Sequence, residues 1–137
     1  MKELISWSEQ YSVGINKFDE DHKVIISLIN QLHNAMLENK AKEAISKILS
    51  VLTSYSATHF EREEMLLKQH NYPNLDVQKK EHAAFIKKIK DFETKYNQGR
   101  IITVSIEIVS FLKEWLIKHI LAEDKEYSKF LISKGVK

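Results

Sequence analysis

Two pairs of side chains in this sequence combine imidazole with carboxylate at spacings that suit a metal site. His59 and Glu63 are four residues apart in H-F-E-R-E, so they share one face of a helix. His119 and Asp124 are five residues apart in H-I-L-A-E-D, which rotates the pair by roughly 140° on a regular helix. That spacing needs a widened last turn or a helix end. Imidazole with carboxylate is a donor set for iron, zinc or copper.

A histidine recurs on each of four apolar stripes with helical periodicity. The stripes have apolar residues at steps of three and four, and they run through residues 22–36, 45–66, 78–89 and 104–119. One histidine on such a stripe is more often a hydrogen-bonded core residue than a ligand. Four, one on each helix, favour a shared site. These histidines are His22, His59, His82 and His119.

The connections between the four predicted helices are short. Because short links favour antiparallel neighbours, the sequence predicts an all-α fold, an up-down-up-down antiparallel four-helix bundle. The connections fall at residues 39–40, 71–75 and 97–103.

We expect one domain over residues 1–137. Its predicted parts are an N-terminal arm at 1–18, the bundle at 19–122 and a C-terminal tail at 123–137 with a short final helix. The arm is predicted because its apolar residues lack helical spacing. They are Trp7, Tyr11, Val13 and Ile15.

This topology brings the four histidines to one level. Two lie near the starts of their helices and two near the ends, and in alternating antiparallel helices these positions meet at the same end of the bundle. Two carboxylates among several histidines indicate a two-metal centre, with Glu63 and Asp124 as the predicted bridges. Asp19, three residues before His22, is predicted to be an N-cap or an outer hydrogen-bond partner of that histidine.

Two further histidines are predicted to bind no metal. His33 and His70 each lie eleven residues beyond a histidine of the site, which is about 16 Å along a helix axis. The chain also lacks any Glu-x-x-His sequence, the motif of ferritin-like diiron bundles. A histidine-rich centre is therefore the better interpretation.

Composition excludes several other classes of protein. With no cysteine, the chain cannot form disulfides, thiolate zinc sites or cysteine-ligated iron–sulfur clusters. A net charge of +2 without a dense basic cluster gives no footprint for nucleic acid. The N-terminus lacks the apolar run of a signal peptide and no stretch approaches transmembrane length, so we expect no membrane partner and a cytoplasmic location. Three glycines and one proline favour helices over a β-barrel or sandwich.

Across nearly the whole chain, the order and spacing of its motifs resemble the hemerythrin family, and most closely its single-domain bacterial branch, the bacteriohemerythrins. Separately the motifs are weak, but together they are highly specific. They are W-S-E-Q-Y-S-V-G-I, F-D-E-D-H, H-F-E-R-E-E-M, N-Y-P, K-E-H-A-A-F and W-L-I-K-H-I-L-A-E-D.

The resemblance implies an oxo- or hydroxo-bridged non-haem diiron site that binds O2 reversibly. By this carry-over, His22 and His59 ligate the iron that has an open position for O2. His82 and His119 ligate the second iron, and the two carboxylates bridge both. The family also implies that Trp115 and Leu116 line the oxygen pocket, although they can equally serve as bundle core.

One position departs from the family pattern, which has a fifth histidine four residues before the one matching His82. This sequence has Gln78 there. Three outcomes are open for this position. Gln78 can ligate the second iron through its amide oxygen, or it can hydrogen-bond to a water that takes the coordination position. In the third outcome the second iron does not bind. A weaker donor on the second iron would open a coordination position on both metals, which suits peroxide chemistry.

We therefore predict a diiron protein that binds O2 in storage, delivery (oxygen transport) or sensing. Its alternative is a diiron peroxide reductase or oxidase, and a further alternative is a metal-free interaction bundle. The expected small-molecule partner is O2 or peroxide, and no protein partner is predicted.

Overall fold

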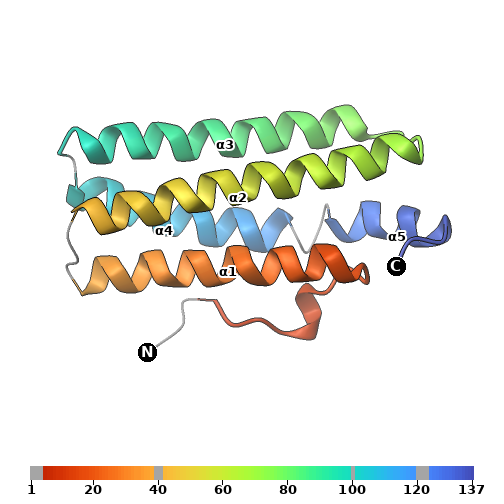
Figure 1. Ribbon diagram of the computed structural model, residues 1–137, viewed down its shortest axis with the longest axis horizontal. Helices are drawn as coiled ribbons and strands as arrows, with labels where there is room; N and C mark the ends of the chain where they lie inside the picture. The colour runs from red at the N-terminus through yellow and green to blue at the C-terminus, as the bar shows by residue number, and fades with distance from the viewer. Residues whose placement is uncertain (1–4, 39–41, 100, 120–123) are drawn as a thin grey trace.

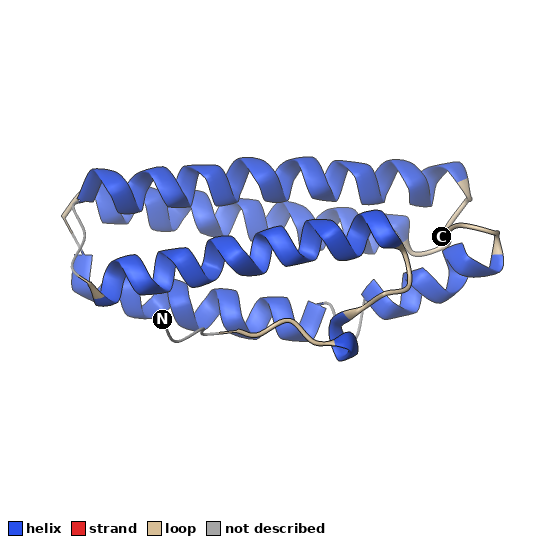
Figure 2. Ribbon diagram, turned by 60° about the horizontal axis from the view of Figure 1, so that its bottom comes forward, coloured by secondary structure: helices blue, strands red, loops and turns tan. Residues whose placement is uncertain are grey.

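The computed structural model describes residues 5–38, 42–99, 101–119 and 124–137. Within these ranges every regular element is a helix (Figures 1 and 2). None of the described helices is both long and apolar enough to cross a bilayer. The elements are the 3-10 turn η1 (Glu9–Tyr11) and the helices α1 (Asn16–Leu37), α2 (Lys42–Gln69), α3 (Leu75–Asn97), α4 (Ile101–Lys118) and α5 (Lys125–Ser133).

Helices α1 to α4 form the predicted antiparallel four-helix bundle. Helix α1 contacts α2 and α4, and α3 contacts the same two helices, so the four close into a ring. Figure 1 shows that α1 and α3 begin at the end of the bundle where α2 and α4 finish. Helix α5 extends beyond α4 at this same end, as the predicted short final helix.

The predicted boundaries differ slightly from the observed ones. Helix α1 begins at Asn16, three residues before the predicted start of the bundle, because buried Phe18 extends the apolar stripe by one turn. Helix α4 already begins at Ile101, within the connection predicted at 97–103. The connection predicted at 39–40 and the bundle end predicted at 122 lie outside the described residues.

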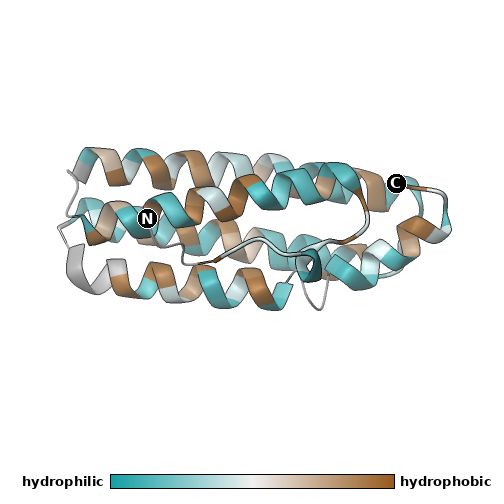
Figure 3. Cartoon of the chain, turned by 90° about the horizontal axis from the view of Figure 1, so that it is seen from below, coloured by the Kyte–Doolittle hydropathy of each residue, from teal (hydrophilic) through white to brown (hydrophobic). Residues whose placement is uncertain are grey.

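Large aliphatic side chains at helical spacing make the core of the bundle. Figure 3 shows brown apolar segments alternating with teal polar ones along each helix, as expected where each helix buries one face. The sequestered apolar surface supplies the main driving force for folding, about 25 cal/mol per Å². Fully buried members from the four helices are Leu32, Leu49, Leu52, Ile89, Ile108 and Leu112.

The turn between α2 and α3 sets the start of the third metal-site helix. Asn71 adopts the left-handed conformation, with φ of 56°. The Tyr72 amide donates to the Leu67 carbonyl at 2.9 Å, and the Asn71 amide donates to the Lys68 carbonyl at 3.1 Å. These two bonds make a Schellman motif, which ends α2 sharply. Pro73 then prevents the helix from continuing, so the chain reverses into α3.

The N-terminal arm is held along the bundle by polar contacts (Figure 2). The Asn30 side chain accepts a hydrogen bond from the Ile5 amide at 3.0 Å and donates to the Ile5 carbonyl at 2.8 Å. Asp19 accepts from the Ser12 hydroxyl at 2.6 Å and from the Val13 amide at 2.8 Å. The expected role of Asp19 as an N-cap or as a partner of a histidine was therefore wrong, because its carboxylate turns outward to the arm.

Candidate metal centre

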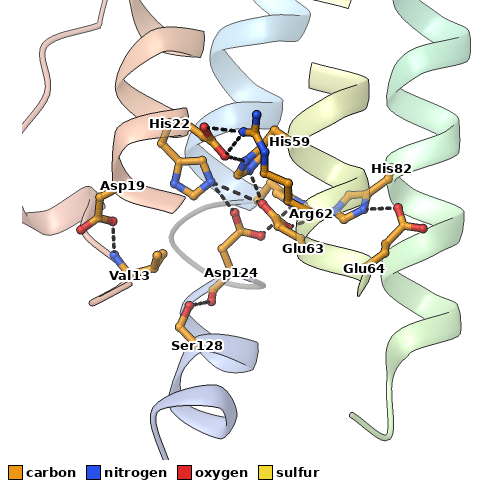
Figure 4. A network of polar contacts seen from close by, with 12 residues as sticks. Val13, Asp19, His22, His59, Arg62, Glu63, Glu64, His82, Asp124 and Ser128 are labelled. Atoms are coloured by element: carbon orange, nitrogen blue, oxygen red, sulfur yellow. Dashed lines mark hydrogen bonds and ion pairs between the residues drawn. The ribbon is translucent and has the colours of Figure 1, made fainter. Parts of the chain in front are cut away.

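The predicted residues His22, His59, His82, Glu63 and Asp124 converge at one level, at the end of the bundle that carries α5 (Figure 4). The fourth predicted histidine, His119, joins them through its contact with Asp124. Each side chain is buried, with at most 4% of its surface exposed. Their donor atoms form two groups that share one residue, and within each group the atoms lie within 4.8 Å of one another. Two ligands on opposite sides of one metal at about 2.1 Å each would be about 4.2 Å apart. The groups are His22, His59 and Glu63, and Glu63, His82 and His119.

The shared residue, Glu63 on α2, directs one carboxylate oxygen to each group. Its Oε1 contacts Nε2 of His59 and lies 3.7 Å from Nε2 of His22. Its Oε2 lies 3.5 Å from Nε2 of His82. Glu63 therefore has the placement of a carboxylate that bridges two metals.

Asp124 spans the two groups from the other side. Its Oδ2 lies 3.1 Å from Nε2 of His22, and its Oδ1 lies 2.7 Å from Nε2 of His119. Both His119 and Asp124 have π-helical backbone, and Asp124 immediately precedes α5. The 2.7 Å contact shows that the two side chains meet despite the unfavourable rotation that the five-residue spacing would have on a regular helix.

The site fits a cation because most of its facing polar atoms are buried without a hydrogen bond of good geometry. Both carboxylate oxygens of Glu63 and of Asp124, and Nε2 of His59 and His82, have no hydrogen bond of good geometry among the described residues. A buried charge that is left unpaired costs several kcal/mol, so such groups are normally paired or coordinate a metal. Two divalent cations would satisfy both carboxylates and the facing imidazoles together.

An outer carboxylate orients His59. Its Nδ1 lies 2.8 Å from Oδ2 of Asp21, which is fully buried on α1. Asp21 also accepts from the Tyr55 hydroxyl at 2.9 Å and from Arg62 Nη1 at 2.8 Å. Burial would raise the pKa of Asp21, but the hydrogen bonds from these three partners hold it well below its ordinary value. The ionised carboxylate keeps the proton of His59 on Nδ1 and leaves Nε2 free for a metal.

Two further histidines face outer carboxylates. Nδ1 of His82 lies 2.9 Å from Oε2 of Glu64, and Nδ1 of His119 lies 3.8 Å from Oε2 of Glu81. Nδ1 of His22 is buried without a hydrogen bond among the described residues. The outer carboxylates thus follow the order of the helices. A carboxylate on α1 faces a histidine on α2, one on α2 faces a histidine on α3, and one on α3 faces His119, which directly follows α4.

Sequence reasoning missed these outer carboxylates, although the sequence contains a signal for them. Each adjoins a ligand of its own helix, and adjacent residues on a helix are about 100° apart. When the ligand points to the bundle axis, its neighbour therefore points to the next helix. The adjoining pairs are Asp21 with His22, Glu64 with Glu63, and Glu81 with His82.

Tyr127 on α5 is a further residue that the sequence analysis did not assign to the site. It is fully buried, and its hydroxyl has no hydrogen bond of good geometry within the described part of the chain. Burial and the nearby carboxylates of Asp124 and Glu63 raise the pKa of this hydroxyl well above its ordinary value. Tyr127 therefore stays protonated and supplies an O–H beside the bridging carboxylates.

The charges of the site are set by its own carboxylates. Burial would lower the pKa of His22, but Asp124 and Glu63 raise it to about 10. Burial would raise the pKa of Glu63, but the facing histidines lower it well below its ordinary value. Protons on the imidazoles and metal ions therefore compete for the same carboxylates.

Aromatic rings cover the histidines of the second group. Trp115 stacks on His119, with centroids 4.2 Å apart and an interplanar angle of 13°, and Phe60 stacks on His82 at 4.0 Å and 5°. Leu116 is buried, whereas Trp115 is half-buried. Aromatic rings therefore lie directly against the two imidazoles of this group.

The structure places the remaining predicted positions as follows. His33 and His70 are half-buried and belong to neither ligand group. Gln78 is buried on α3, one turn before His82.

Comparisons with known proteins point to one family. The family model described as "Hemerythrin HHE cation binding domain" matches residues 13–131. The chain is 31% identical over 130 residues to the bacteriohemerythrin of Clostridium acetobutylicum, covering 90% of this chain and 98% of the relative. It is 32% identical over 125 residues to the myohemerythrin of Theromyzon tessulatum, covering 91% and 92% of the two chains. A crystal structure of wild-type hemerythrin is similar with a TM-score of 0.85 and 27% identity, covering 93% of this chain and 98% of that one.

Proposed function

Because this chain belongs to the hemerythrin family, we propose that it binds O2 at a diiron centre held by its own six buried ligands. Proteins of this family bind O2 at such a centre. The observation that carries the proposal is the pair of ligand groups that share Glu63. The proposed ligands are His22, His59, Glu63, His82, His119 and Asp124.

The protein side chains would divide the work between them. The diiron group supplies the reversible electron transfer that O2 binding needs. Glu63 and Asp124 would hold the two metals, since each places one oxygen toward each histidine group. The outer carboxylates fix the ring orientation of the ligating imidazoles. Trp115 and Leu116 exclude water, which favours O2 release over irreversible oxidation.

Iron stoichiometry and O2-dependent absorption test this proposal. We expect two irons in each chain, and a visible charge-transfer band that appears when O2 is added to the ferrous protein and disappears when O2 is removed. Glu63→Gln should lose the band together with iron, because one bridge is weakened. Gln98→Leu, at the exposed C-cap of α3, is the matched control and should keep both. A protein that carries two irons but shows no O2-dependent band would contradict O2 binding.

Gln78 favours a second candidate function, the reduction of hydrogen peroxide to two waters by an external donor of two electrons and two protons. An amide in place of an imidazole gives a weaker neutral donor, which would leave that side of the centre more open to a second oxygen ligand. Steady consumption of hydrogen peroxide with an added electron donor, lowered in Gln78→His, would support this activity. Absence of turnover in the iron-loaded protein would remove it.

The observations support O2 binding without separating its uses. Storage and delivery require only this domain, whereas sensing requires a partner that responds to the O2-bound form. Measuring the O2 off-rate, and testing whether O2 changes capture of a candidate partner by this domain, would distinguish carriage from sensing.

A further inference from the structure

We propose that Gln78 is a direct metal ligand, through its side-chain oxygen Oε1, at the metal held by Glu63, His82 and His119. This inference rests on the proposed metal site. The first observation is that Gln78 is only 4% exposed. The second is that its Oε1 is buried without a hydrogen-bond partner among the described residues.

The rotation of α3 turns the Gln78 side chain into the bundle. The flanking residues Val77 and Lys79 are exposed, whereas Gln78 is buried. The backbone amide of Gln78 donates to the Asn74 carbonyl at 3.2 Å, so Gln78 belongs to the first turn of α3. Residues four apart lie on the same face, so Gln78 shares the inward face of His82.

The ligand group that contains His82, one turn after Gln78, has further polar atoms without a hydrogen bond. Nδ1 of His82 lies 2.9 Å from Oε2 of Glu64, so the neutral tautomer that donates to Glu64 presents Nε2 as an acceptor. The two oxygens of Glu63 have no hydrogen bond of good geometry within the described residues. A buried amide oxygen without a partner costs about 1–3 kcal/mol. A cation is the one partner that satisfies the oxygen, the imidazole and the carboxylate at once.

The reach of the side chain favours direct ligation over an intervening water. Oε1 of glutamine and Nε2 of histidine are both four bonds from their Cα atoms. Two such residues, one helical turn apart on the same face, bring their donor atoms to the same depth in the bundle. A water between Oε1 and the metal would need the side chain to stop short of that depth.

This ligand makes the two metal positions more alike than they would be with a further imidazole. Each metal then has two histidines, His22 and His59 for one and His82 and His119 for the other, with shared carboxylates. The carbonyl oxygen is a hard, neutral and weaker donor than imidazole for a divalent transition metal. Loss of Gln78 should therefore weaken binding of the metal beside it, while the metal held by His22 and His59 keeps its own ligands.

Cobalt loading without oxygen tests the inference apart from any O2 chemistry. Co²⁺ absorbs more intensely as its coordination number falls, so the spectrum reports loss of a ligand directly. In Gln78→Leu we expect one of the two bound Co²⁺ ions to lose about tenfold or more in affinity, with a rise in absorption. Gln78→Glu offers a charged oxygen at the same reach and should bind that ion more tightly. Gln98→Leu should match the unsubstituted protein.

Three outcomes would overturn direct ligation. The first is unchanged affinity and spectrum in Gln78→Leu. The second is weakened binding with an unchanged spectrum, which would assign Gln78 as the anchor of a metal-bound water. The third is weaker binding in Gln78→Glu, a variant that stays informative if Gln78→Leu does not fold. If the unsubstituted protein binds no metal at all, the proposed function fails together with the inference.

Discussion

Asp21 offers the sharpest test of how the protein prepares its ligands. The change Asp21→Asn keeps the shape of the side chain and removes its charge. Asp21 accepts hydrogen bonds from His59 at 2.8 Å, from Arg62 at 2.8 Å and from Tyr55 at 2.9 Å, in a fully buried position. The variant keeps one acceptor oxygen and turns an amide NH2 toward the other donors.

The size of the effect follows from these contacts. A hydrogen bond to a charged group contributes about 1.5–3 kcal/mol, roughly twice a neutral one. Weakening the bond to His59 and losing one bond to Arg62 should therefore lower the free energy of unfolding by about 2–4 kcal/mol. Loss of an outer partner typically lowers metal affinity about 10–100-fold, or about 1.4–2.7 kcal/mol. We expect the lower end of that range, since a neutral acceptor remains.

Two assays separate these effects. Urea unfolding of the metal-free protein measures the free energy of unfolding, and competition with a chelator measures metal affinity in the folded protein. Asp19→Asn is the matched control, because it removes the same charge two residues away and its side-chain hydrogen bonds go to Ser12 and Val13 of the arm. Metal affinity in Asp21→Asn within twofold of the unsubstituted protein would refute the reasoning that Asp21 orients His59.

Three further predictions concern pH, a turn and the core. The His22 pKa is raised from 6.5 to about 10 in the folded protein. The stabilisation that protonated His22 gives to the metal-free fold is therefore complete below pH 6.5 and is lost as pH rises through 10. The urea midpoint of the metal-free protein should fall between these two pH values. Gly14 has a φ of +78°, and a Cβ added there would lie 2.9 Å from the side chain of Ile132. Gly14→Ala should therefore lower the free energy of unfolding by about 1–3 kcal/mol, measured as a lower melting temperature. Leu52→Ala should cost about 2–5 kcal/mol in urea unfolding, whereas Val51→Ala, at an exposed position, should stay within about 0.5 kcal/mol. A urea midpoint that rises with pH, an unchanged melting temperature in Gly14→Ala, or equal losses in Leu52→Ala and Val51→Ala would contradict these expectations.

The four-helix bundle was predictable because its evidence is local. Apolar residues three and four apart define a helix face wherever the helix lies, and short connections leave few arrangements for successive helices. The short final helix was predicted on the same basis and is confirmed. The exact start of α1 was not predicted. Phe18 is identified as a core residue only by its edge-on packing against His59, with ring centroids 5.8 Å apart.

The sequence by itself also indicated which side chains the structure brings together as a candidate metal site. One histidine on each apolar stripe, with Glu63 a turn after His59, specifies both the donor types and their common level once the helices alternate. These conclusions depend only on the periodicity of a helix and on antiparallel topology. Gln78 stood out for a further reason, since it occupies a position where the family pattern has a histidine.

Only the tertiary structure decided which outer carboxylate contacts which histidine of the site. Asp19 and Asp21 are two residues apart on one helix, yet the first holds the arm and the second orients His59 on α2. Their roles depend on how far each helix is rotated about its axis and on its axial register with its neighbours. Those two quantities are settled by the packing of the whole core, and no local pattern encodes them.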